Sequence, residues 1–148
     1  MLVSSGGAGI LCDPWFEGKA FNGWRLLHKE KQDINRLEFD YIWISHEHPD
    51  HFSIPTLKLL KRKTKFLYQE TKDKKVVSWL KKEGHEVIEL KPYIGNTIED
   101  LTLTTYPFSG YDTALVIRDK DGIVYLNAND CRLEEEEVLE QIKSKHKH

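Results

Sequence analysis

The stretch that decides the fold is Tyr41-Ile42-Trp43-Ile44-Ser45, followed by His46-Glu47-His48-Pro49-Asp50-His51. The first half is apolar and rich in aromatic and β-branched residues, which predicts a buried strand. Pro49 prevents a regular helix through the second half, because the residue before a proline is pushed towards extended geometry. Side chains alternate in an extended segment, so we expect His46, His48 and Asp50 to share one face while His51 points elsewhere.

The six positions from 46 to 51 hold three imidazoles and two carboxylates. Imidazole nitrogen and carboxylate oxygen together suit a borderline divalent metal such as zinc, and iron and manganese also accept these donors. A chain with seven histidines can also cluster three on a solvated loop by chance. The position of this cluster, directly after a buried strand, favours metal ligation.

The pattern at His46, His48, Asp50 and His51 resembles the His-x-His-x-Asp-His signature of the metallo-β-lactamase superfamily. The resemblance implies two divalent metal ions, with the first two histidines on one ion and the aspartate and last histidine on the other. It also implies an α/β fold, the four-layer αββα sandwich, of which this chain would supply a truncated version.

Asp130 is the next candidate ligand, in the loop that follows an apolar run from 123 to 127. The resemblance implies that an aspartate here bridges both ions, which gives the sets His46, His48, Asp130 and Asp50, His51, Asp130. The alternative is that Asp130 caps the helix expected to start near 133.

Two histidines of the superfamily pattern are missing from this chain. One would fall near Phe108-Ser109-Gly110 and one after Asp130, yet the only later histidines are His146 and His148. Asp112 lies near the first gap, but we expect it to pair with backbone in the turn. A depleted ligand set predicts weaker metal retention, an unusual metal or an inactive relative. His28 and His85 are isolated and are expected to be surface or packed residues.

A second resemblance covers residues 11–60 and extends downstream. Its matching residues are Asp13-Pro14-Trp15, Gly18, Ala20-Phe21, Gly23-Trp24, Leu26-Leu27-His28, Ile44-Ser45-His46, Pro55-Thr56-Leu57-Lys58, Asp112-Thr113, Asn127 and Asp130-Cys131. Together they are similar to the metallo-β-lactamase-like domain of CMP-N-acetylneuraminate hydroxylases. That family also carries a Rieske iron–sulfur module, whose Cys-x-His and Cys-x-x-His pairs are absent here. The similarity therefore does not carry the hydroxylation with it.

Composition bounds the remaining possibilities. With 148 residues, 39% of them hydrophobic and 31% charged, we expect a single domain over 1–148. A formal charge of −2 gives no reason to expect a nucleic-acid partner. No apolar run approaches a membrane span and no secretory signal is recognisable, so we expect no membrane partner and a cytoplasmic protein. Cys12 and Cys131 are expected to be reduced core thiols.

The pattern of apolar residues predicts strands alternating with helices. We expect strands at 10–13, 41–44, 65–68, 86–90, 101–106, 114–118 and 123–127, the last two forming a hairpin through Lys120-Asp121-Gly122, and helices at 54–63, 72–83 and 133–145. Val3 is expected to lie in a strand paired with 10–13. Ser53 and Pro55 would start the first helix, and Leu57, Leu59 and Leu60 would face inward. The tail from 145 to 148 is expected to fray, and the alternative is that it marks a point where a longer chain was cut.

The leading functional hypothesis is a metal-dependent hydrolase acting on a small-molecule ester, lactone or phosphodiester. Asp50 would be catalytic, because it would both ligate a metal and orient the attacking water. Asp13 is expected to accept a hydrogen bond from an imidazole, and Trp15, Phe21 and Trp24 to form a wall near the site. The alternatives are an iron-containing hydroxylase relative that needs a separate Rieske partner, and a degenerate non-catalytic member. A homo-oligomer is left open.

Overall fold

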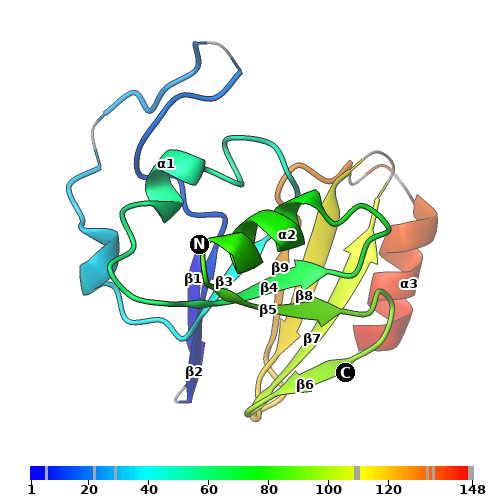
Figure 1. Cartoon of the computed structure of the whole chain (residues 1–148). Coiled ribbons are helices and arrows are strands. Elements are labelled where there is room, and N and C mark those ends of the chain that lie inside the picture. The colour runs from blue at the N-terminus through cyan, green and yellow to red at the C-terminus, as the bar shows by residue number, and fades with distance from the viewer. Residues whose placement is uncertain are drawn as a thin grey trace.

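Two β-sheets facing each other form the frame of the protein (Figure 1). The computed structural model describes residues 1–5, 7–21, 23–28, 30–108, 111–132, 134 and 136–146. The first sheet has the order β1-β2-β3-β4-β5 and the second the order β6-β7-β8-β9. The strands are β1 (Leu2–Ser5), β2 (Ala8–Cys12), β3 (Tyr41–Ile44), β4 (Lys65–Gln69), β5 (Glu86–Leu90), β6 (Asn96–Ile98), β7 (Leu101–Pro107), β8 (Thr113–Arg118) and β9 (Val124–Asn127).

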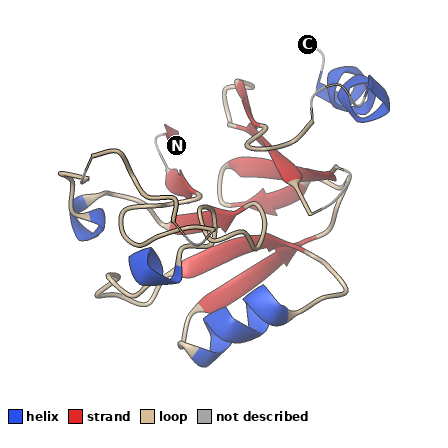
Figure 2. Cartoon of the chain, turned by 90° about the horizontal axis from the view of Figure 1, so that it is seen from above, coloured by secondary structure: helices blue, strands red, loops and turns tan. Residues whose placement is uncertain are grey.

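Helices cover the outer faces of both sheets (Figure 2). They are the 3₁₀ helix η1 (Ile34–Arg36) and the α-helices α1 (Ile54–Leu57), α2 (Lys75–Lys82) and α3 (Glu136–His146). One apolar cluster lies between the sheets, a second joins the first sheet to α1 and α2, and a third joins the second sheet to α3. This layering is the predicted αββα sandwich.

Strand β3 shows how the sequence builds two of these layers. Tyr41 and Trp43 belong to the cluster between the sheets, whereas Ile42 and Ile44 belong to the cluster under the helices. Successive strand residues point to opposite faces, so a strand with both faces covered must be apolar throughout. All four residues are buried, as the sequence predicts.

The parallel strands of the first sheet end at a common edge. In the register of β2, β3 and β4, Cys12 is opposite Trp43 and Trp43 is opposite Leu67. The segments that follow these strands, beginning with Asp13 and Ser45, are therefore neighbours. The pairing of β1 with β2 is antiparallel and places Val3 opposite Ile10, which confirms the predicted hairpin.

Helix α1 is shorter than the predicted helix 54–63. Ser53 caps it by accepting a hydrogen bond from the Thr56 amide, and a proline occupies its first turn, as predicted. The helix ends at Leu57, and Lys58 is its C-cap. Three residues further on, the Lys61 amide donates to the side-chain oxygen Oδ1 of Asn35 at 2.9 Å. The prediction that Leu59 faces inward is wrong, since its side chain is 42% exposed.

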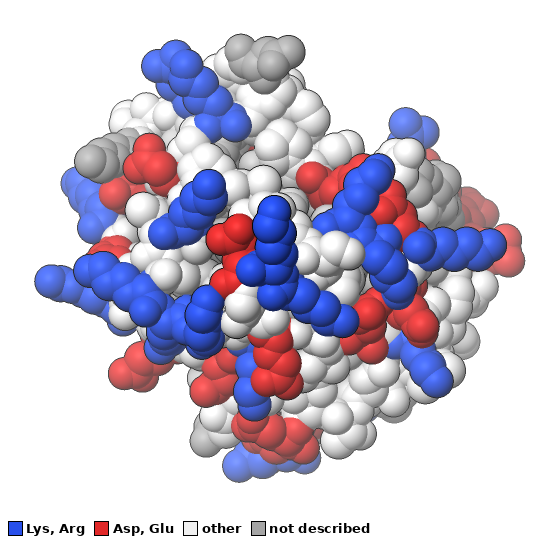
Figure 3. Space-filling model, in the orientation of Figure 1, with Lys and Arg blue, Asp and Glu red and all other residues white. Residues whose placement is uncertain are grey.

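The other predicted elements are present with modest shifts. Helix α2 begins at Lys75 and buries Val76, Val77 and Leu80, and its lysines lie on a surface that mixes both signs of charge (Figure 3). The 120–122 segment joins the antiparallel pair β8 and β9. Strand β6 was not predicted, because three residues are too few for a periodic signal.

The chain ends and the cysteines have defined surroundings. Lys145 and His146 belong to α3, so the prediction that they fray is wrong; His146 Nε2 lies 2.9 Å from the Tyr106 hydroxyl. The other two tail residues, and Leu133 at the expected helix start, lie outside the described residues.

Both cysteines are buried, and burial raises the pKa of the Cys12 thiol to about 12. None of the described helices has the length and apolar character needed to cross a membrane.

Replacing Trp43 by alanine tests the assignment of the central layer. Trp43 is fully buried, so Trp43→Ala should lower the free energy of unfolding by about 3–5 kcal/mol. The matched control is Trp24→Ala, where a 65% exposed side chain should cost no more than about 0.5 kcal/mol. Urea unfolding followed by circular dichroism measures both. Equal losses would contradict the layer assignment.

Candidate metal centre

A turn, and not an extended segment, follows His46. The amides of His51 and Phe52 both donate to the His48 carbonyl, at 3.0 and 2.6 Å. This turn brings the His51 ring back towards His46, with their ring centroids 4.2 Å apart. The prediction that His51 points away from the other ligands is therefore wrong. Pro49 rules out a regular helix but still allows a single turn, in which position 51 returns to the face of position 46.

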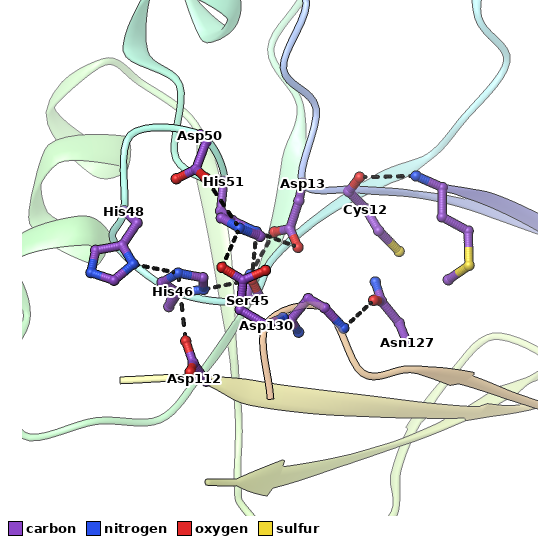
Figure 4. Close-up of polar contacts among 12 residues, drawn as sticks. Cys12, Asp13, Ser45, His46, His48, Asp50, His51, Asp112, Asn127 and Asp130 are labelled. Atoms are coloured by element: carbon purple, nitrogen blue, oxygen red, sulfur yellow. Dashed lines mark hydrogen bonds and ion pairs between the residues drawn. The ribbon is translucent and has the colours of Figure 1, made fainter. Parts of the chain in front are cut away.

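His46, His48 and Asp112 form the first group of candidate ligands (Figure 4). Nε2 of His46 lies 2.8 Å from Nδ1 of His48 and 3.6 Å from Oδ1 of Asp112. Asp112 does make the expected turn contact, because its carbonyl accepts from the Phe108 amide. Its side chain, however, also faces the histidines from the β7–β8 loop, whereas the sequence analysis placed Asp112 near the vacant position and expected only the turn contact.

The second group consists of His46, His51 and Asp130, so the two groups share His46. Nε2 of His51 lies 3.3 Å from Oδ2 of Asp130 and 3.7 Å from Oδ2 of Asp50. The five predicted ligands thus come together at one edge of the sandwich. Asp130 follows β9, is 56% exposed and lies well before α3, so it does not cap that helix.

Asp13 and Ser45 contact the Nδ1 atoms of the imidazoles and so orient the rings. Asp13 Oδ2 lies 3.2 Å from His51 Nδ1, and Asp13 Oδ1 accepts from the Ser45 amide at 2.8 Å. The Ser45 hydroxyl lies 2.9 Å from His46 Nδ1 and 3.3 Å from His51 Nδ1. The predicted contact from Asp13 to an imidazole is confirmed. Because the partners occupy Nδ1, Nε2 of both rings is left for a metal.

Two residues at this site have a positive φ, a conformation that Phe21, Tyr93 and Glu99 also adopt in the described chain. Asp13 has φ +44° and Asn129, next to Asp130, has φ +37°. Non-glycine residues occupy this left-handed region at a cost, and persist there when the surroundings require it. Here the strained positions aim two carboxylates at one histidine.

The surroundings shift the pKa values of His46 and His51 in opposite directions. Burial lowers the pKa of His46, and the nearby charge of His51 adds to this effect against the opposing charge of Asp112. Burial also opposes the charged form of His51, but the hydrogen bond and charge of Asp13, with the charges of Asp130 and Asp50, outweigh it and raise the pKa. The lowered pKa favours the neutral form of His46 that a metal binds, whereas the raised pKa makes a proton a stronger competitor with a metal for His51.

Aromatic residues line the approach to the histidines. The Phe21 ring lies 5.3 Å from the His48 ring, and Trp15 lines a cavity that also borders Asp13, Asp50 and His51. The prediction of an aromatic wall is confirmed for these two residues. Trp24 packs on Phe21, at 5.4 Å between centroids, and is not in contact with the ligands.

Other sequence expectations have simple outcomes. His85 accepts a hydrogen bond from the Thr64 amide and His28 is exposed, so neither belongs to the ligand groups found among the described residues. At the site expected for the missing histidine, Ser109 and Gly110 lie outside the described residues. Ser45 was also missed as a site residue, because a serine that ends a strand carries no distinctive pattern.

The donor set fits divalent metal ions. Nitrogen and carboxylate oxygen atoms of each group lie within 4.8 Å of one another. In addition, Oδ1 of Asp50 is buried without a hydrogen-bond partner in the described part of the chain. A buried, unpaired carboxylate oxygen is costly, and a cation would satisfy it. The expected shortage of ligands is also smaller than the histidine count indicates, because Asp112 faces the first pair.

An αββα sandwich with a histidine–aspartate cluster at its strand ends defines a metal-binding class of protein. Residues 1–126 match the model of the β-lactamase superfamily domain, and the chain belongs to this family. It is 34% identical over 143 residues to the cytidine monophosphate-N-acetylneuraminic acid hydroxylase of Danio rerio. That match covers 88% of this chain and 24% of the relative, so the chain spans about a quarter of its length.

Solved structures show the same fold at lower sequence identity. The diiron β-hydroxylase CmlA from Streptomyces venezuelae superposes with a TM-score of 0.67 and 21% identity, covering 88% of this chain and 27% of that one. An isothiocyanate hydrolase from Delia radicum gut bacteria gives a TM-score of 0.73 and 17% identity, covering 99% and 64%. The fold thus occurs in proteins named as hydrolases and as hydroxylases.

The contact between Asp13 and His51 yields a prediction for metal affinity. Asp13→Asn should weaken zinc binding by about 10- to 100-fold, because the imidazole loses its orienting carboxylate. The control is Asp121→Asn, an exposed aspartate in the β8–β9 turn that should leave affinity unchanged. Competition titration with a chromogenic chelator measures both. Wild-type affinity in Asp13→Asn would contradict this orienting role.

Proposed function

We propose that this domain is a metal-dependent hydrolase that holds two divalent metal ions, and zinc is the metal that we propose for both. His46, His48 and Asp112 would hold one ion, and Asp50, His51 and Asp130 the other. The observation that supports this most directly is that two groups of donors, one with His48 and Asp112 and the other with His51 and Asp130, meet at His46. Asp50 joins the second group through its oxygen 3.7 Å from His51 Nε2. When bound, such ions polarise a carbonyl or phosphoryl oxygen and make water acidic enough to act as a nucleophile near neutral pH.

The protein's own residues supply orientation and charge. Asp50 has one oxygen near His51 and a second, Oδ1, without a partner in the described part of the chain, so it can ligate and accept a hydrogen bond from water. Phe21 and Trp15 shield the approach. Hydrolysis needs no reactant besides the substrate and water. We propose a small-molecule ester, lactone or phosphodiester as substrate, because each has a carbonyl or phosphoryl oxygen that the metal ions would polarise.

Replacing Asp50 tests this proposal. Asp50→Ala should reduce metal-dependent hydrolysis of p-nitrophenyl acetate and bis(p-nitrophenyl) phosphate on the order of a hundredfold or more, because one residue provides both ligation and orientation. Asp121→Ala serves as the control, and elemental analysis of protein purified without chelator reports the bound metals. If Asp50→Ala keeps wild-type rates, Asp50 has no catalytic role.

One observation favours a second candidate, an iron-dependent hydroxylase. Two imidazoles and one carboxylate, as in His46, His48 and Asp112, are the donor set of many non-haem iron oxygenases. The sequence similarity to a named hydroxylase points the same way. Such a reaction places one atom of O₂ in the substrate and reduces the other to water, so it needs two electrons from a separate donor such as a Rieske protein. Iron in the purified protein, with donor-dependent O₂ consumption and no hydrolysis, would favour it.

A further inference from the structure

A cavity of about 130 Å³ lies beside the ligand group formed by His46, His48 and Asp112. It opens between the end of β4, the start of α2 and the β7–β8 loop. Asp112 belongs both to its wall and to the ligand group, so a molecule in the cavity would border the metal centre. Its polar wall residues include Glu47, Tyr68, Gln69, Thr71, Asp73 and Asp112.

Glu47 places an unpaired negative charge in this wall. It stands between His46 and His48 and is half-buried, and no cationic group in the described ranges lies within 4.0 Å of its carboxylate. Asp73, in contrast, is paired with Lys75 at 2.9 Å. A metal would offset the charge of Asp112. The hydrogen bond and charge of Asp73, and then the charge of Glu47, raise the pKa of the exposed Lys75, which pairs with Asp73. Glu47 therefore interacts with Lys75 but has no ion pair of its own among the described residues.

Gln69 adds a neutral acceptor to the same wall. Its side chain is only 7% exposed, and its Oε1 atom is buried without a hydrogen-bond partner among the described residues. Buried carbonyl oxygens almost always have a donor, and leaving one without costs about 1–3 kcal/mol. The missing donor is one that a ligand in the cavity can supply.

Apolar residues lie beside these polar groups in the wall. Val76 and Phe108 are buried apolar residues that border the cavity. In such surroundings a charge pair is screened less than at an open surface. An anionic ligand would meet Glu47 without a compensating lysine or arginine in the cavity wall.

We propose that this cavity is a substrate subsite for a group bearing a protonated amine. An ammonium has three donors and no acceptor, which matches a wall with a free carboxylate and an unsatisfied amide oxygen. The inference rests on the proposed function, since it names the class of substrate that the metal centre would act on: a hydrolysable small molecule with an amino group next to the scissile bond.

Matched esters test the charge preference in the zinc-loaded protein. The probes are p-nitrophenyl glycinate, p-nitrophenyl acetate and mono-p-nitrophenyl succinate, which carry a cationic, a neutral and an anionic acyl group. We expect kcat/KM, corrected for the spontaneous hydrolysis of each ester, to be highest for the glycinate. In Glu47→Gln the ratio of glycinate to acetate should fall about five- to tenfold. The control Glu86→Gln removes an exposed carboxylate at the start of β5 and should leave the ratio unchanged.

A binding measurement separates this inference from the proposed hydrolysis. Dissociation constants of n-propylammonium and n-propanol are measured by NMR titration of metal-free protein and of zinc-loaded protein. In both forms we expect tighter binding of the ammonium, reduced in Glu47→Gln and in Gln69→Met. The melting temperature of Glu47→Gln should not fall, because an unpaired half-buried carboxylate does not stabilise the fold.

The outcomes are distinct. Ammonium binding that depends on Glu47, without hydrolysis of any ester, would support the cavity assignment and contradict the hydrolase. Hydrolysis of all three esters without preference, together with equal binding of propylammonium and propanol, would overturn the amine subsite and leave the hydrolase standing.

Discussion

The side chain of Asp13 is the contact on which the site depends. One of its oxygens accepts from the Ser45 amide and so joins the ends of β2 and β3, and the other contacts His51. Its own amide donates to the Trp43 carbonyl at 2.9 Å, which continues the pairing of the two strands. A single carboxylate therefore links the sheet to the ligand loop. This explains why a residue with an unfavourable positive φ is held at this position.

The site gathers more negative charge than the protein neutralises by itself. Asp13, Asp50, Asp112 and Asp130 all lie around three imidazoles. Burial opposes the charged form of His51, but Asp13, Asp130 and Asp50 outweigh it and raise the pKa of this ring. Carboxylates brought this close repel one another unless protons or cations intervene. Metal binding would relieve this repulsion, so affinity for metal and stability of the fold should be coupled. The same reasoning leaves Glu47, outside the ligand groups, as the charge available to a substrate.

The strands could be predicted because their signals are local, whereas the αββα arrangement of the layers was implied by the resemblance to the metallo-β-lactamase superfamily. An apolar run such as 41–44, with both faces buried, has few alternatives. Asp130 could be placed because its position after a late strand matches that of an aspartate in the superfamily. The return of His51 towards His46 could not be predicted, because it depends on two amides sharing the His48 carbonyl. Asp112 was placed near the vacant ligand position but assigned to the turn for a similar reason: its side-chain direction depends on how the second sheet packs against the first.

The central claim is that Asp112 completes one metal position and that Asp50, His51 and Asp130 form another. Anomalous-difference maps from crystals of the zinc- or iron-loaded protein test it most directly. The account predicts two peaks, one within coordination distance of His46 Nε2, His48 Nδ1 and an Asp112 oxygen, and the other beside His51 Nε2. A single peak, or two peaks with the Asp112 side chain turned away from both, would contradict it.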